Sequence, residues 1–113
     1  MNNTRELLKL AQENPDLPIV PMVDSEVVCD DSYCYWQGRF GRCEVTEWVC
    51  VTMWGNPRFF TRDEQDYIEE YFADKIIDED ESGLSDEQIE KIAHEMAETL
   101  DWQKAIVVYI GTL

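Results

Sequence analysis

The chain has 113 residues, of which 44% are apolar and 12% aromatic, and its formal net charge is −16 at pH 7. This length and composition predict one globular domain over residues 1–113 and argue against intrinsic disorder. The negative charge disfavours direct binding to nucleic acid or to an anionic membrane, because their phosphates would repel the chain.

A short amphipathic helix is predicted over residues 4–13, with Asn3 and Glu6 in a start that resembles a capping box. Pro15 cannot continue the helical hydrogen bonds, so the helix is expected to end before it. Residues 18–60 then favour β structure. Gly38 and Gly41 are expected to allow a tight reversal around 39–40. Candidate strands cover 19–23, 26–29, 33–36, 42–54 and 58–60.

Two helices and a last strand complete the expected order. Thr61 and Glu64 predict a capping box at the start of a helix over 61–77, and the next helix is expected over 86–100. The inward residues of these helices are expected to be Ile68, Tyr71, Phe72 and Ile76, followed by Ile89, Ile92, Ala93, Met96 and Leu100. The apolar run from Lys104 to Ile110 suits a central strand.

These elements predict a small α+β domain. Its sheet is expected to be mainly antiparallel, with four to five strands covered by three helices. The expected element order is α-β-β-β-β-α-α-β, and no internal repeat or linker is visible.

The segment 78–90 resembles a calcium-binding loop, in which oxygen ligands recur at alternate positions around a central glycine. Asp78, Asp80, Ser82, Gly83 and Asp86 fit the expected positions, but the twelfth position is Ile89 and the acid falls one place late, at Glu90. Ser85 and Gln88 allow another interpretation of this segment, because they can form a capping box at the start of the second helix. A helix start is therefore the better interpretation, and a calcium-responsive protein stays an alternative.

Catalytic and metal-binding patterns are weak. The four cysteines, Cys29, Cys34, Cys43 and Cys50, form no Cys-x-x-Cys pair and lie in strand-like segments. His94 is the single histidine, and Glu90 and Glu98 share its helix face, which is expected to be a solvated acidic face. We therefore expect neither an enzyme nor a protein with a metal or another cofactor.

The location of the protein follows from two absences in the sequence. The N-terminus lacks the apolar segment of a signal peptide, and the longest apolar run, 105–110, is too short to cross a bilayer. A cytoplasmic location is therefore expected, with reduced cysteines.

Most of the charge lies in residues 61–101, which hold 16 acidic and 3 basic residues. Acidic side chains three or four residues apart share one face of a helix, and rows of carboxylates at this spacing can imitate the phosphates of a nucleic acid. A surface that only keeps the protein soluble would have the same composition. The candidate contact residues for a basic partner are Glu64, Glu69, Asp74, Asp78, Asp80, Glu87, Glu90 and Glu98.

Aromatic residues on the short strands form a second candidate surface. Tyr33, Tyr35, Trp36, Trp48 and Trp54 occur beside Arg39, Arg42 and Arg58. When exposed, Trp, Tyr and Arg are typical anchors of protein interfaces, and when buried they are ordinary core. The exposed case predicts a structural or regulatory module that assembles through the aromatic strands.

Three blocks of sequence, 14–24, 35–41 and 102–110, resemble short acidic proteins encoded by phages and prophages of Firmicutes. Ser32 stands where that pattern often has glycine, and Asp101 where it often has proline. The resemblance transfers no catalytic residue. It implies an accessory phage protein that acts in a bacterial host cell, where small acidic proteins block nucleases of CRISPR and restriction systems.

Together these patterns predict a non-catalytic acidic protein that presents 61–101 to a basic, nucleic-acid-binding host protein, as a DNA-mimic inhibitor does. The oligomeric state has no signal in the sequence.

Overall fold

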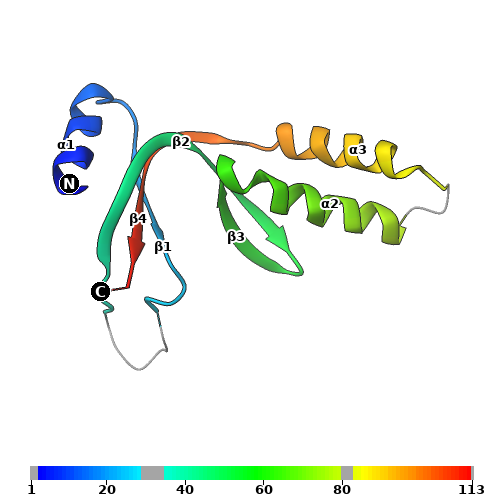
Figure 1. Cartoon of the computed structure of the whole chain (residues 1–113), viewed down its shortest axis with the longest axis horizontal. Helices are drawn as coiled ribbons and strands as arrows, with labels where there is room; N and C mark the ends of the chain where they lie inside the picture. Colours follow the sequence, from blue (N-terminus) through cyan, green and yellow to red (C-terminus); the bar gives the residue numbers. More distant parts are fainter. Residues whose placement is uncertain (1–2, 29–34, 80–82, 113) are drawn as a thin grey trace. The chain divides into compact units, whose positions relative to one another are not determined.

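The structure, a computed structural model, describes residues 3–28, 35–79 and 83–112. In chain order the elements are α1, β1, β2, β3, a 3-10 helix, α2, α3 and β4 (Figure 1). Their bounds are α1 Asn3–Glu13, β1 Ile19–Val23, β2 Arg39–Met53, β3 Asn56–Thr61, the 3-10 helix Arg62–Glu64, α2 Gln65–Glu79, α3 Asp86–Glu98 and β4 Gln103–Gly111. The predicted α+β class is confirmed, with three helices and a mixed four-stranded sheet.

The strands follow the order β1-β4-β2-β3 across the sheet. β1 and β4 are parallel, with Ile19 opposite Ile106 and Val23 opposite Ile110. β2 and β3 are antiparallel, with Trp48 opposite Thr61 and Met53 opposite Asn56. β4 lies between β1 and β2, which confirms that the apolar run at the C-terminal end is a central strand.

The chain divides into two compact units. The first, the terminal unit, is Met1–Glu47 with Lys104–Leu113, and the second, the middle unit, is Trp48–Gln103. β2 contributes residues to both units. The expectation of a single domain stays a prediction.

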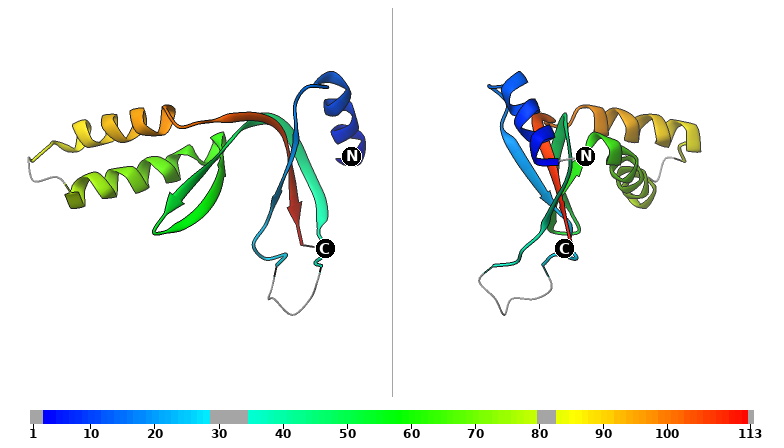
Figure 2. Two further views of the ribbon diagram at one scale, coloured as in Figure 1. Left: turned by 180° about the vertical axis from the view of Figure 1, so that it is seen from behind. Right: turned by 60° about the vertical axis from the view of Figure 1, so that its left-hand side comes forward.

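In the terminal unit, β4 carries the core. Ala105, Ile106, Val107 and Val108 are all buried, as expected for a strand with neighbours on both sides. β4 runs beside the first half of β2 in the opposite direction (Figure 2). The side-chain amide of Asn3 donates to the carbonyl oxygen of Phe40, so it ties α1 to β2.

One strand prediction and one turn prediction in this unit are wrong. Residues 26–28 form a turn region and not a strand, because the Asp24 carboxylate accepts from the Glu26 N–H at 2.9 Å and the Asp24 carbonyl from the Val27 N–H at 3.0 Å. Gly41 lies within β2 and makes no reversal. A Cβ there would come within 3.0 Å of the Tyr109 carbonyl oxygen, so the glycine permits close strand approach. The strand expected over 33–36 lies partly outside the described residues, and 35–36 are not in a strand.

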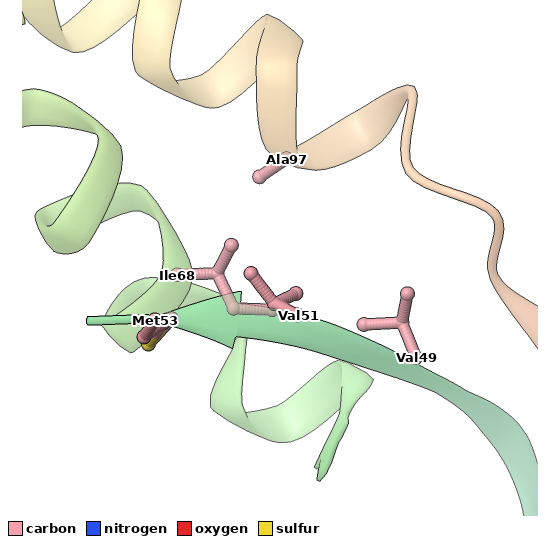
Figure 3. Close-up of a cluster of buried hydrophobic side chains, with 5 residues drawn as sticks. All are labelled: Val49, Val51, Met53, Ile68 and Ala97. Carbon is pink, nitrogen blue, oxygen red and sulfur yellow. The ribbon is translucent and has the colours of Figure 1, made fainter. Parts of the chain in front are cut away.

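The middle unit has its own core. Figure 3 shows Val49, Val51 and Met53 along the second half of β2, with Ile68 from α2 and Ala97 from α3 completing the cluster. α2 and α3 lie side by side as an antiparallel hairpin (Figure 1). The alternation of the three strand residues places them on one face of β2.

The inward residues of α3 differ in part from the prediction. Ile89 and Ala93 are buried as expected, but Ile92 is 36% and Met96 40% exposed. Ala97, which was not among the predicted inward residues, is completely buried. A small residue at this position lets the end of α3 approach the core closely, and the face centred on Ala93 and Ala97 turns the longer Ile92 and Met96 outward.

Candidate functional site: the acidic helical hairpin

Seven of the eight predicted contact residues belong to described parts of the middle unit. Asp80 lies outside the described residues. Glu64 is in the 3-10 helix; Glu69, Asp74 and Asp78 are on α2; Glu87, Glu90 and Glu98 are on α3. The structure gives these carboxylates three different environments.

Glu64 has a structural contact. Its Oε1 accepts hydrogen bonds from the backbone N–H of Thr61 at 3.1 Å and from the Thr61 hydroxyl at 3.3 Å. The predicted capping box is therefore present, although it begins a 3-10 turn and α2 starts only at Gln65. Because this oxygen already accepts two hydrogen bonds, Glu64 is a weak candidate for partner contact.

Glu98 belongs to a polar network at the open end of the hairpin. Its Oε1 accepts from Gln65 Nε2 at 2.8 Å, and its Oε2 lies 3.5 Å from Arg62 Nη1. The Gln65 hydrogen bond, followed by Arg62 and His94 against an opposing desolvation effect, lowers the pKa of the Glu98 carboxyl. This carboxylate is thus held ionised by its own chain and links the two helices.

Glu69 and His94 make a second link between the helices. His94 Nδ1 lies 3.2 Å from Glu69 Oε1, and His94 Nε2 lies 3.9 Å from Glu98 Oε1. The His94 side chain is 56% exposed, so it lies on a solvated acidic face as predicted. The carboxylate beside it from α2 is Glu69, which periodicity within one helix could not reveal. Among the described residues, no group of three His, Cys, Asp or Glu side chains is placed to hold a metal ion.

The remaining candidates are exposed on the two helices. Asp74, Asp78, Glu87 and Glu90 have no hydrogen bond or ion pair with another residue that the structure describes. Asp66, Glu70 and Glu95 are also exposed on these helices and were not among the eight candidates. Against these acids, the sequences of α2 and α3 contribute two lysines, Lys75 and Lys91.

The candidates do not share one face. Glu69 and Asp78 are nine residues apart, which is about 2.5 helical turns, so they lie on opposite sides of α2. Glu90 and Glu98 flank His94 at four residues on either side, on the flank of α3 that meets Glu69. Asp74 and Asp78 lie on the other flank of α2. The acidic surface therefore wraps around the hairpin.

The described end of the segment that resembles a calcium-binding loop is an ordinary helix start, at Ser85. The Ser85 hydroxyl accepts from the Gln88 N–H at 3.3 Å, and Gln88 Oε1 accepts from the Ser85 N–H at 2.9 Å. This capping box is the one predicted, and Ile89 at the twelfth loop position is buried at 7% exposure. Ligand positions 80 and 82 lie outside the described residues.

The described cysteines and one pocket in the terminal unit offer little for catalysis. Cys43 and Cys50 are free thiols, and burial, with a smaller effect of the Glu6 carboxylate, raises the pKa of Cys43. A raised pKa lowers the fraction of reactive thiolate at neutral pH. The pocket is small and open, and its lining has no charged side chain: Val23, Val27, Trp36, Gly38, Phe40 and Ile110.

The aromatic candidates divide between exposed and half-buried positions. Tyr35 is 90% and Trp54 74% exposed, whereas Trp36 and Trp48 are half-buried. Tyr33 lies outside the described residues. Trp54 therefore belongs to the surface of the middle unit, beside α2.

Comparisons with known proteins gave no relative: no family model, no curated protein and no solved structure matches this chain. Within the described residues, no helix has both the length and the apolar character that a membrane span requires.

Proposed function

We propose that this protein is a non-catalytic interaction protein that presents the acidic surface of α2 and α3 to a basic, nucleic-acid-binding protein. In this proposal it occupies the partner's nucleic-acid groove as a DNA mimic. The setting is a bacterial host cell, with the protein as a phage-encoded inhibitor of the anti-CRISPR or anti-restriction kind.

One observation carries the proposal: four exposed carboxylates of the hairpin lack a neutralising partner among the residues that the structure describes. Asp74, Asp78, Glu87 and Glu90 have neither a hydrogen bond nor an ion pair to a described residue. Exposed acids of this kind keep their charge available to an external cation. Carboxylates one helical turn apart are about 5.4 Å apart, a spacing on the scale of the charges along a nucleic acid strand.

The energetics of the hairpin support the same proposal. Like charges three or four residues apart destabilise a helix by about 0.2–0.5 kcal/mol per pair. Four such pairs lie on α2: Asp66 pairs with Glu69 and with Glu70, Glu70 with Asp74, and Asp74 with Asp78. Repulsion between these carboxylates destabilises the free protein, and a basic partner that neutralises them relieves it.

The experiment combines capture from a bacterial lysate at low salt with elution by rising salt. The captured protein is then purified and its dissociation constant measured at several salt concentrations, with and without duplex DNA as competitor. We expect affinity to fall steeply with salt, since exposed charges are screened within about 8–10 Å, and DNA to compete for the site. An affinity that is insensitive to both salt and DNA would contradict the proposal.

Matched variants locate the surface. Asp74→Asn with Asp78→Asn, and separately Glu87→Gln with Glu90→Gln, each remove two exposed charges from the hairpin. Glu13→Gln with Asp16→Asn removes the same charge from exposed positions of the terminal unit. The hairpin variants are expected to weaken binding and to flatten its salt dependence. If the Glu13 and Asp16 variant weakens binding equally, net charge and not the hairpin surface is responsible.

A further inference from the structure

The turn between β2 and β3 has an unusual residue. Met53 pairs with Asn56, so Trp54 and Gly55 form a two-residue loop, and both have positive φ, 49° and 80°. Such a turn favours Asn-Gly, because the left-handed region is unfavourable for bulky side chains. Trp54 therefore occupies a position where its backbone is strained and where asparagine would fit better.

The Trp54 side chain is exposed but held in place. It is 74% exposed, and its ring stacks on Tyr71 of α2 with centroids 5.1 Å apart and planes 6° apart. Tyr71 in turn contacts Phe72, and both pack against the core cluster of the middle unit. A large aromatic surface with a fixed orientation is typical of an interface anchor, since little conformational entropy is lost on binding.

The charged residues around Trp54 and Tyr71 indicate that this surface suits a cationic ligand. Asp74 and Asp78 follow Tyr71 by three and seven residues, on the same flank of α2, and both are exposed. Arg58 and Lys75 already lie over the Trp54 and Tyr71 rings, at 5.6 and 5.7 Å. These distances are near the outer limit of about 6 Å for a cation–π contact, so the rings are weakly engaged by their own chain.

We propose that Trp54, Tyr71, Asp74 and Asp78, here called the Trp54 patch, bind an arginine side chain of the partner. A planar guanidinium can stack on the indole and donate hydrogen bonds to a carboxylate, whereas a lysine ammonium cannot stack in this way. The inference rests on the proposed function, because it assumes a basic partner. It adds that recognition selects arginine over lysine and that Trp54 is the anchor.

The test uses octa-arginine and octa-lysine peptides, which carry equal charge, and measures their dissociation constants by calorimetry at low salt. The full-length protein is compared with Trp54→Asn, a change that suits the turn and so preserves folding. Tyr35→Asn, at a position 90% exposed in the terminal unit, is the control. Circular dichroism confirms that each variant is folded.

We expect octa-arginine to bind tighter, on the order of two- to fivefold, which is the scale of an exposed cation–π contact. Trp54→Asn should abolish this preference, and Tyr35→Asn should retain it. Equal binding of the two peptides, or a preference that survives Trp54→Asn, would overturn the Trp54 patch while leaving the acidic docking surface intact. If neither peptide binds, both the patch and the proposed function are wrong.

Discussion

The indole Nε1 of Trp102 donates a hydrogen bond of 2.9 Å to the carbonyl oxygen of Ala97 in the last turn of α3. The last carbonyls of a helix have no intrahelical partner four residues later, so a side-chain donor compensates for that loss. Arg62 makes a cation–π contact with the same side chain, with its guanidinium carbon 4.1 Å from the Trp102 ring centroid. Trp102 therefore secures the end of α3 and packs against the core of the middle unit.

Trp102→Phe is expected to lower the free energy of unfolding by about 1 kcal/mol, because it keeps an aromatic ring and removes the donor. Urea denaturation followed by far-ultraviolet circular dichroism measures the change. Trp54→Phe is the control, since its exposed indole makes no hydrogen bond with a described residue. An equal loss in the two variants would show that the hydrogen bond to Ala97 contributes nothing.

The pH dependence of stability should respond to Glu98. Its pKa is lowered in the folded state from an ordinary value of 4.5, first by the Gln65 hydrogen bond. A folded pKa below the unfolded one stabilises the protein above the unfolded pKa, and this contribution disappears as the pH falls through the folded pKa. Glu98→Gln should therefore reduce stability at neutral pH slightly and make the acid loss below about pH 4.5 less steep.

Thermal unfolding at a series of pH values from neutral to acid measures this effect. Glu95→Gln, which removes one exposed carboxylate from the same helix, is the charge-matched control. If Glu98→Gln gives the same profile as the unmodified protein, the Gln65 and Arg62 contacts do not favour the ionised carboxyl.

The core of the middle unit depends on Ile68 of α2, which is completely buried and packs in one cluster with residues of β2 and α3. Ile68→Ala should lower the free energy of unfolding by about 2–5 kcal/mol, through lost burial and the cavity left behind. Ile77→Ala, at a position of the same helix that is 56% exposed, should change it by less than about 0.5 kcal/mol. Chemical denaturation of both variants compares them, and similar losses would contradict this packing.

Close approach of two strands in the terminal unit depends on Gly41. Gly41→Ala would place a Cβ 3.0 Å from the Tyr109 carbonyl oxygen, a backbone atom that cannot rotate away. We expect a loss of about 1–3 kcal/mol in the free energy of unfolding, typical of overpacking. Gly111→Ala, whose Cβ would meet nothing within 4 Å, should be close to neutral. Differential scanning calorimetry of the pair measures the difference, and equal melting temperatures would refute this role.

The sequence predicts a structural feature well where the residues that form it are close together in the chain. The Thr61–Glu64 and Ser85–Gln88 capping boxes form between residues three apart, and the structure contains both. The apolar run at 104–110 also predicted a buried strand, since a strand with neighbours on both sides must be apolar on both faces. Such patterns depend on residues close in sequence, so the sequence alone is enough to recognise them.

Errors arose where a residue's role depends on a distant partner. The sequence predicts a turn at Gly41, but a glycine is needed there because the Tyr109 carbonyl oxygen, on a strand far along the chain, leaves no room for a Cβ. Helical spacing places Glu98 beside His94, and the two side chains do lie 3.9 Å apart, but the nearer carboxylate, Glu69, approaches from α2 and has no signal within α3. Ala97 was missed as a core residue because its burial depends on how closely α3 packs against β2 and α2.

By itself, the sequence determined the α+β class, the capping boxes at Thr61 and Ser85 and the concentration of acid in residues 61–101. These follow from periodicity, capping and composition, which act over a few residues. The tertiary structure decided which carboxylates remain available, because pairing across the hairpin engages Glu69 and Glu98 and leaves Asp74 and Asp78 exposed on the opposite flank of α2. Electrostatic pairing depends on distance in space, and that distance is set only when the two helices pack.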